Sequence, residues 1–121
     1  MPKLILVIED NEKNMLLMRD ILTYHQYDVI EATDGEMGIK LAREKKPDLI
    51  FMDIQMPVMD GFTAANILKT DPQTKNIKII GITSYAMKGD KEKILDAGFD
   101  DYISKPINTR QLHEVVKNII G

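Results

Sequence analysis

The sequence predicts an α/β fold, a doubly wound five-stranded parallel sheet with five helices in a single domain. Five short apolar segments alternate along the chain with five segments of helical periodicity, and no linker or repeat separates them. Residues 49–52 are apolar without polar alternation, which is typical of a strand buried on both faces, as in a parallel sheet. A chain of 121 residues is long enough for one hydrophobic core of this kind.

The first half of the chain supplies two strands and two helices before the central strand. Residues 4–8 form an apolar run, and residues 14–25 carry apolar side chains at helical spacing, with Asp10 or Asn11 placed to cap that helix. Residues 29–32 form a short second strand, which the turn signal Asp34-Gly35 closes. A second helix follows and must end before Pro47; its expected core face is Met37, Leu41 and Ala42.

The second half begins with the central strand, which runs directly into the carboxylate of Asp53. Asp60-Gly61 is expected to start a third helix, and residues 77–83 form a fourth strand. Residues 87–97 predict a weak helix, because Gly89 and several charged residues crowd its first turns. A fifth strand over residues 101–104 and a last helix, capped by Asn108, complete the alternation.

Composition excludes several classes of function. The formal net charge is −3 without a long basic run, which argues against direct binding to nucleic acid. The absence of cysteine excludes disulfides, thiolate metal sites and cysteine nucleophiles. No apolar segment approaches the roughly 20 residues of a membrane span, and the N-terminus lacks a signal-peptide pattern. We therefore expect a cytoplasmic protein without membrane insertion.

Polar side chains follow four of the predicted strands at the point where each strand ends. Because the carboxyl ends of parallel strands share one edge, we expect these residues to converge there: Glu9, Asp10, Asp53, Thr83 and Lys105. Three carboxylates in a small volume repel one another and need a cation, and a ligand set made only of oxygen favours Mg²⁺. A magnesium site with a lysine and a hydroxyl suits phosphoryl transfer to a carboxylate, for which Asp53 on the central strand is the best candidate.

Each of these residues also has an ordinary structural explanation. Glu9-Asp10-Asn11 alone is more often a helix cap than a metal site, and Asp53 alone could cap the following turn. Thr83 alone would usually be a loop hydroxyl, and Lys105 alone a solvated lysine. Four such coincidences at four strand ends favour the functional interpretation. The two histidines, His25 and His113, are interpreted as ordinary helix residues.

The chain resembles, over its whole length (residues 1–121), the receiver domain of two-component response regulators. The motifs that carry the resemblance are Glu9-Asp10-Asn11, FMDIQMPVMDG around Asp53, GITSYAM around Thr83, and YISKP ending at Pro106. The resemblance implies the flavodoxin-like receiver fold with strand order 2-1-3-4-5. Asn11, Asn14 and the segments AMKGD and YISKPI are similar to DivK-type single-domain regulators, and receivers of hybrid histidine kinases share them.

The resemblance also implies roles for the converging residues. Asp53 would accept a phosphoryl group from a histidine kinase or a histidine phosphotransfer protein. Mg²⁺ would be held by Asp10, Asp53 and the backbone carbonyl of Gln55, with Glu9 acting directly or through water. Thr83 and Lys105 would contact the phosphoryl oxygens.

Further implications of the resemblance concern the switch and the class of activity. Tyr102 would be the aromatic switch, and the Lys105–Pro106 peptide bond would be cis. The chain would catalyse only its own phosphorylation and dephosphorylation, and would act through downstream protein effectors.

We expect the partner surface on the helix at 87–97, the strand at Tyr102 and the last helix. We also expect Tyr85 to slow loss of the phosphoryl group.

Two functions from other classes stay open as alternatives. A Mg²⁺-dependent phosphatase with an aspartyl nucleophile would resemble its class in having a second Asp two residues after the nucleophile, where this chain has Gln55. A flavodoxin-like cofactor carrier would need a phosphate-cradling loop after the first strand, where this chain has Glu9-Asp10.

Overall fold

The computed structural model describes residues 2–56, 59–84 and 90–120, and it forms one five-stranded sheet in which all neighbouring strands are parallel. The strand order is β2-β1-β3-β4-β5, which confirms the predicted fold class and order. The strands are β1 (Leu4–Ile8), β2 (Asp28–Ala32), β3 (Leu49–Asp53), β4 (Lys78–Thr83) and β5 (Asp101–Ser104). The helices are α1 (Glu12–Tyr24), α2 (Gly35–Lys45), α3 (Gly61–Thr70), α4 (Asp90–Asp96) and α5 (Thr109–Ile120).

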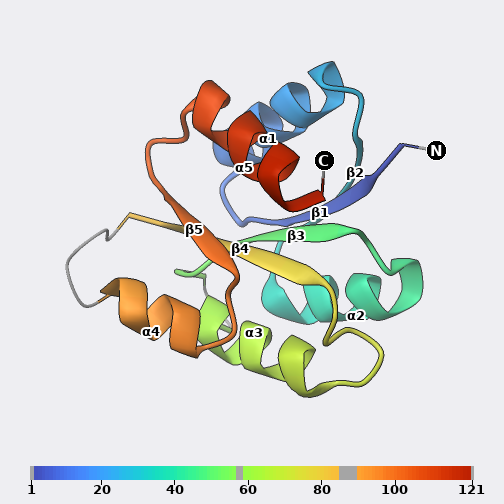
Figure 1. The fold of residues 1–121 in the computed structure, drawn as a ribbon, viewed down its shortest axis with the longest axis vertical. Coiled ribbons are helices and arrows are strands. Elements are labelled where there is room, and N and C mark those ends of the chain that lie inside the picture. Colours follow the sequence, from blue (N-terminus) through green and yellow to red (C-terminus); the bar gives the residue numbers. More distant parts are fainter. Residues whose placement is uncertain (1, 57–58, 85–89, 121) are drawn as a thin grey trace.

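The helices cover both faces of the sheet, with α1 and α5 on one face and α2, α3 and α4 on the other (Figure 1). The predicted elements are present and shifted at their ends by a few residues. The helix expected over residues 87–97 is described only as Asp90–Asp96, and residues 87–89 lie outside the described part of the chain. Among the described helices, none has the length and apolar character needed to cross a membrane.

Four helices begin with the same capping arrangement. The side chain of the residue before the helix accepts a hydrogen bond from the backbone N–H three residues later, at Asn11, Asp34, Asp60 and Asn108, over 2.8–3.0 Å. Such a cap stabilises a helix by about 1 kcal/mol. The structure assigns the first cap to Asn11, so Asp10 before it is left for another role.

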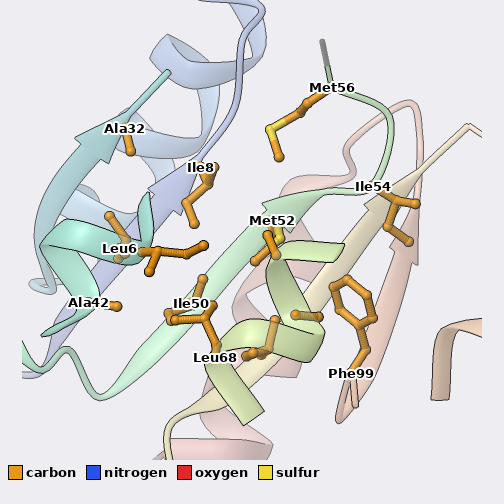
Figure 2. Packing of buried hydrophobic residues seen from close by; sticks show 14 of the residues in the cluster. Leu6, Ile8, Ala32, Ala42, Ile50, Met52, Ile54, Met56, Leu68 and Phe99 are labelled. Carbon is orange, nitrogen blue, oxygen red and sulfur yellow. The ribbon is translucent and has the colours of Figure 1, made fainter. Parts of the chain in front are cut away.

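The central strand β3 separates two hydrophobic cores. Alternate side chains of β1 and β3 point to opposite faces, so that Ile50 and Met52 pack toward α2 and α3 while Leu49 and Phe51 pack toward α1 and α5. Figure 2 shows the first of these cores, with Leu68 near Ile50 of β3 and Phe99 near Ile54. All five residues of β3, including Asp53, are buried. The carboxylate is therefore held at the end of a fully buried strand.

The buried face of α2 differs from the expected one at Met37, which is 47% exposed. Ala42 is buried and Leu41 packs partly buried against the core, as expected, and the other buried residues are Gly35, Gly38 and Ile39. The reason is close packing, since a Cβ atom on Gly38 would overlap the side chain of Ile8. A prediction from large apolar side chains alone does not identify a helix face that contains glycine.

Gly61 fixes the chain immediately after the central strand. Its N–H donates to the Ile54 carbonyl over 2.8 Å, and a Cβ atom there would lie 2.6 Å from Ile54 Cα and 3.0 Å from the Asp53 carbonyl oxygen. Because both atoms belong to the backbone, Gly61→Ala must displace either α3 or the end of β3. We expect a loss of about 1–3 kcal/mol in the free energy of unfolding, measured by urea denaturation. Asn66→Ala, at an exposed position of the same helix, is the control, and equal stability of the two variants would contradict this account.

Candidate functional site

The sequence-predicted site residues lie at the carboxyl edge of the sheet, on or directly after four different strands. Glu9 and Asp10 follow β1, Asp53 ends β3, Thr83 ends β4 and Lys105 follows β5. Carboxylate oxygens of Glu9, Asp10 and Asp53 lie within 4.8 Å of one another. The Lys105 ammonium lies 3.0 Å from Asp53 Oδ2 and 3.9 Å from Glu9 Oε1. Folding therefore brings three acids and one base, far apart in sequence, into one cluster.

Both oxygens of the Asp53 carboxylate accept hydrogen bonds. Oδ1 accepts from the backbone N–H of Gln55 over 3.0 Å, and Oδ2 accepts from Lys105 Nζ over 3.0 Å. The Asp53 residue is only 2% exposed. These two donors hold the plane of the carboxylate and compensate its burial. From the sequence, Gln55 is expected to contribute only its backbone carbonyl. Its N–H contact is the usual turn in which an Asp side chain accepts from the N–H two residues later.

Glu9 is the acid whose carboxylate is buried with one oxygen lacking a partner among the described residues. It is 1% exposed, and its Oε1 accepts from the N–H of Asn11 over 3.2 Å. Its other oxygen, Oε2, is buried without a hydrogen-bond partner among the described residues. Burial, followed by the negative charge of Asp53, raises the pKa of Glu9 to about 7. A buried carboxyl with an unpartnered oxygen is an arrangement that a bound cation would complete.

The ligand set fits a hard divalent cation. Three carboxylates and the Lys105 ammonium give a formal charge of −2 when all are ionised, and every carboxylate oxygen is a hard ligand. Asp10 is exposed, so one side of the cluster is open to an ion from solvent. The unpartnered Glu9 Oε2 is the observation that favours a cation at this position.

Backbone contacts connect the ends of β4 and β5 at the site. The N–H of Lys105 donates to the Thr83 carbonyl over 2.8 Å, and the Lys105–Pro106 peptide bond is cis. Thr83 is 3% exposed.

Tyr102 lies opposite Gly81 in β4, is half-buried, and packs against the core that includes α3 and α4. Tyr85, which is expected to slow loss of the phosphoryl group, lies outside the described residues.

Two clefts flank the cluster. One, of about 460 Å³, is lined by Gln55, Thr83 and residues of α3 and α4. The other, of about 370 Å³, is lined by Glu9, Asp10 and the first turns of α1. The acids and their base thus sit between two open clefts, where groups on another molecule can approach them.

Comparison with known proteins defines the class. The family model for the response regulator receiver domain matches residues 5–117, and the chain belongs to this family. It is a DivK-like receiver domain of a two-component response regulator: it is 43% identical over 121 residues to the polar-differentiation response regulator DivK of Brucella anthropi, covering 100% of this chain and 98% of that protein.

Solved structures agree with this assignment. The chain is similar to the receiver domain of sensor histidine kinase PA1611 from Pseudomonas aeruginosa, with a TM-score of 0.92 and 31% identity over 100% of this chain and 99% of that one. That structure has a magnesium ion coordinated in its active-site cleft. Chemotaxis protein CheY4 of Vibrio cholerae has a TM-score of 0.93 at 23% identity, covering 99% of this chain and 100% of that one, and supports the fold alone.

Proposed function

We propose that the chain is a phosphoryl-accepting switch in which Asp53 takes a phosphoryl group from a phosphohistidine of a histidine kinase or histidine phosphotransfer protein. The observation that carries this proposal is the Asp53 carboxylate, buried on the central strand, bound by Lys105 and clustered with Glu9 and Asp10. Family membership and the magnesium in the PA1611 receiver support it. Only the chain's own phosphorylation and dephosphorylation would be catalysed.

Transfer forms a bond between an Asp53 oxygen and phosphorus and breaks the phosphorus–nitrogen bond of the phosphohistidine, whose ring nitrogen keeps the electron pair. The hydrogen bonds from Gln55 N–H and Lys105 Nζ orient the carboxylate before the reaction. Because Lys105 occupies Asp53 Oδ2 in this structure, we expect its ammonium to transfer that contact to a phosphoryl oxygen. The buried Thr83 at the end of β4 is placed to contact another.

Mg²⁺, when bound, would neutralise charge that develops on the transferring oxygens. Glu9, Asp10, Asp53 and the backbone carbonyl of Gln55 are the proposed ligands, with Glu9 binding directly or through water. Ionised Glu9 would gain a partner for its buried Oε2, which has none among the described protein groups. The three acids and the Gln55 carbonyl thus form the proposed magnesium site, and Lys105 lies beside it.

We place the output on α4, β5 and α5, with Tyr102 as the residue that reports the state of Thr83. Phosphorylation makes Asp53 more negative by about one charge, to which Lys105 and Thr83 respond. On this surface the described part of α4 spans Asp90–Asp96, and its Leu95 is 41% exposed. An exposed apolar side chain on this helix suits contact with protein effectors. The relatives named as polar-differentiation regulators suggest that this output controls cell polarity and the cell cycle.

The test is incubation of the chain with Mg²⁺ and phosphoramidate, followed by intact mass measurement. We expect the addition of one phosphoryl group, and no addition when EDTA replaces Mg²⁺. A phosphatase would instead release phosphate from p-nitrophenyl phosphate with turnover, and a flavodoxin-like carrier would retain flavin mononucleotide. Either of those results without a phosphoryl adduct would overturn the proposal.

The raised pKa of Glu9 predicts how Mg²⁺ binding depends on pH. In the metal-free folded chain Glu9 keeps its proton up to about pH 7, whereas the unfolded chain loses it near 4.5, so stability falls as pH rises through that window. Mg²⁺ must displace this proton, so its affinity should rise about tenfold between pH 6 and pH 8.

Calorimetry of Mg²⁺ binding at pH 6.5, in two buffers of different ionisation enthalpy, measures the protons released. We expect about three-quarters of a proton per ion for the native chain and close to none for Glu9→Gln. Equal proton release by the two proteins would contradict the assignment.

A further inference from the structure

The cleft of about 370 Å³ beside the acidic cluster has one wall formed by a single face of α1. Four side chains of that helix line the cleft at positions i, i+3, i+4 and i+7, so they share one face: Glu12, Met15, Leu16 and Arg19. Glu31 and Thr33, at the carboxyl end of β2, also line it, and Glu9 and Asp10 close its inner end. The cleft therefore extends outward from the proposed magnesium site along α1.

The α1 wall of the cleft offers apolar surface to another molecule. Leu16, which lines the cleft, is 48% exposed, and its neighbour Leu17 is 38% exposed, although α1 buries its other face in the core. The methylene groups of a long basic side chain pack on apolar surface of this kind while the charged end stays in water. The wall thus suits the aliphatic stem of a lysine or an arginine.

The outer acids of the cleft are arranged differently from those of the magnesium site. In the described part of the chain, the acids that converge on one point in a group of three are those of the proposed magnesium site, and neither Glu12 nor Glu31 belongs to that group. Among the same residues the Glu12 carboxylate has no hydrogen bond or ion pair, and Glu31 pairs with Arg19 over 3.2 Å at the surface. Separated carboxylates beside apolar surface suit an extended cation better than a single metal ion.

The reaction itself creates a need for such a cation. A protein that carries phosphohistidine brings a negative phosphoryl group to an edge of the sheet that is already acidic. Lys105 and a bound Mg²⁺ would offset the charge of the inner acids, whereas Glu12 and Glu31 lie outside that group. A positive side chain on the donor, close to its phosphohistidine, would offset the repulsion from the outer acids and favour the encounter.

We propose that this cleft receives a lysine or arginine side chain of the phosphodonor protein, with its stem on Leu16 and its charged end paired with Glu12 and Glu31. The inference rests on the proposed function, because it names a chemical feature of the donor that phosphorylates Asp53. Glu12 and Glu31 select and orient the donor, and neither contacts the transferring phosphoryl group. A donor with a neutral side chain at this place transfers its phosphoryl group more slowly.

The probes are two synthetic helical peptides that each carry one phosphohistidine. In one peptide Arg stands four residues before and four residues after the phosphohistidine, on the same helix face; in the other, citrulline gives the same shape without the charge. Transfer to the whole chain with Mg²⁺ is followed by intact mass, and each rate is divided by the rate with phosphoramidate, which has no side chain for the cleft. We expect the Arg peptide to transfer about three- to tenfold faster, with a smaller advantage in about 0.5 M salt.

Substitutions in the chain separate the cleft from the overall charge. Glu12→Gln and Glu31→Gln should each lower the ratio of the two peptide rates, and the double variant should bring the ratio close to one. Glu44→Gln removes the same charge from an exposed position on α2, which lines a different groove, and it is the matched control. The control should keep the native ratio, because a general attraction between a basic peptide and an acidic chain does not depend on which acid is removed.

The outcomes distinguish this inference from the proposed function. Equal rates from the two peptides, or a ratio that falls as far in Glu44→Gln as in the double variant, would overturn the inference alone, whereas failure of every donor, including phosphoramidate, would overturn both. If the peptides transfer too slowly to measure, NMR with the unphosphorylated peptides decides the question. The Arg peptide should shift the backbone amides of Glu12, Leu16 and Glu31 and the citrulline peptide should not, and equal shifts would refute the assignment.

Discussion

Asp53→Asn is expected to lower phosphoryl incorporation from phosphoramidate by at least about three orders of magnitude, to below detection by intact mass. The amide is not a nucleophile at this position, whereas the native carboxylate has an oxygen nucleophile and is held between Gln55 N–H and Lys105 Nζ. The neighbouring acids are poor substitutes, since Glu9 carries a raised pKa and Asp10 lies after a different strand.

The same substitution should change two further quantities. The charge of Asp53 is the second cause of the raised pKa of Glu9, after burial, so this pKa should fall toward its ordinary value in Asp53→Asn. Loss of one charged ligand should weaken Mg²⁺ binding by roughly tenfold or more. Asp20→Asn, which makes the same change on the exposed side of α1, is the control and should leave all three measurements unchanged. Undiminished incorporation in Asp53→Asn would show that another residue accepts the phosphoryl group.

Lys105→Met is the second substitution with a large expected effect. Lys105 is the base within ion-pair distance of both Asp53 and Glu9 among the described residues, and the lysine is partly exposed. Its removal takes a positive charge from the transferring oxygens, and the loss of one such contact typically lowers the rate by about 10²–10³-fold. The rate is measured as phosphoryl incorporation with time at saturating Mg²⁺.

Mg²⁺ binding distinguishes this explanation from general damage to the fold. Without Lys105 the formal charge of the cluster changes from −2 to −3, so Mg²⁺ should bind more tightly while phosphorylation becomes slower. Lys40→Met, at an exposed position on α2, is the control. A Lys105→Met chain that lost Mg²⁺ binding together with phosphorylation would contradict the assigned role.

The sequence predicted the fold because its strongest signals are physical and local. The short apolar runs must be buried, and helical periodicity between them requires crossover helices, so a parallel sheet follows. The site residues can then be placed together at the carboxyl edge from the strand ends alone: Glu9, Asp10, Asp53, Thr83 and Lys105. The strand order needed the family resemblance, because several orders of five parallel strands satisfy the same pattern.

Other features depended on three-dimensional packing. The buried face of α2 was assigned to Met37 in place of Gly35 and Gly38, because the approach of that helix to Ile8 has no counterpart in a pattern of hydrophobic residues. The buried oxygen of Glu9 and its raised pKa depend on neighbours from other strands. The imidazoles of His25 and His113 also stack on each other although the residues are far apart in sequence, and each looked like an ordinary helix residue.

The measurement that tests the central claim most directly is the position of the phosphoryl group. The chain is phosphorylated with Mg²⁺ and phosphoramidate and then treated with borohydride, which reduces an aspartyl phosphate to homoserine, and its peptides are mapped by mass spectrometry. The account predicts homoserine at position 53 alone, and none in a sample treated without the phosphoryl donor. Reduction at Glu9 or Asp10, or a phosphoryl group on His25 or His113, would contradict the account.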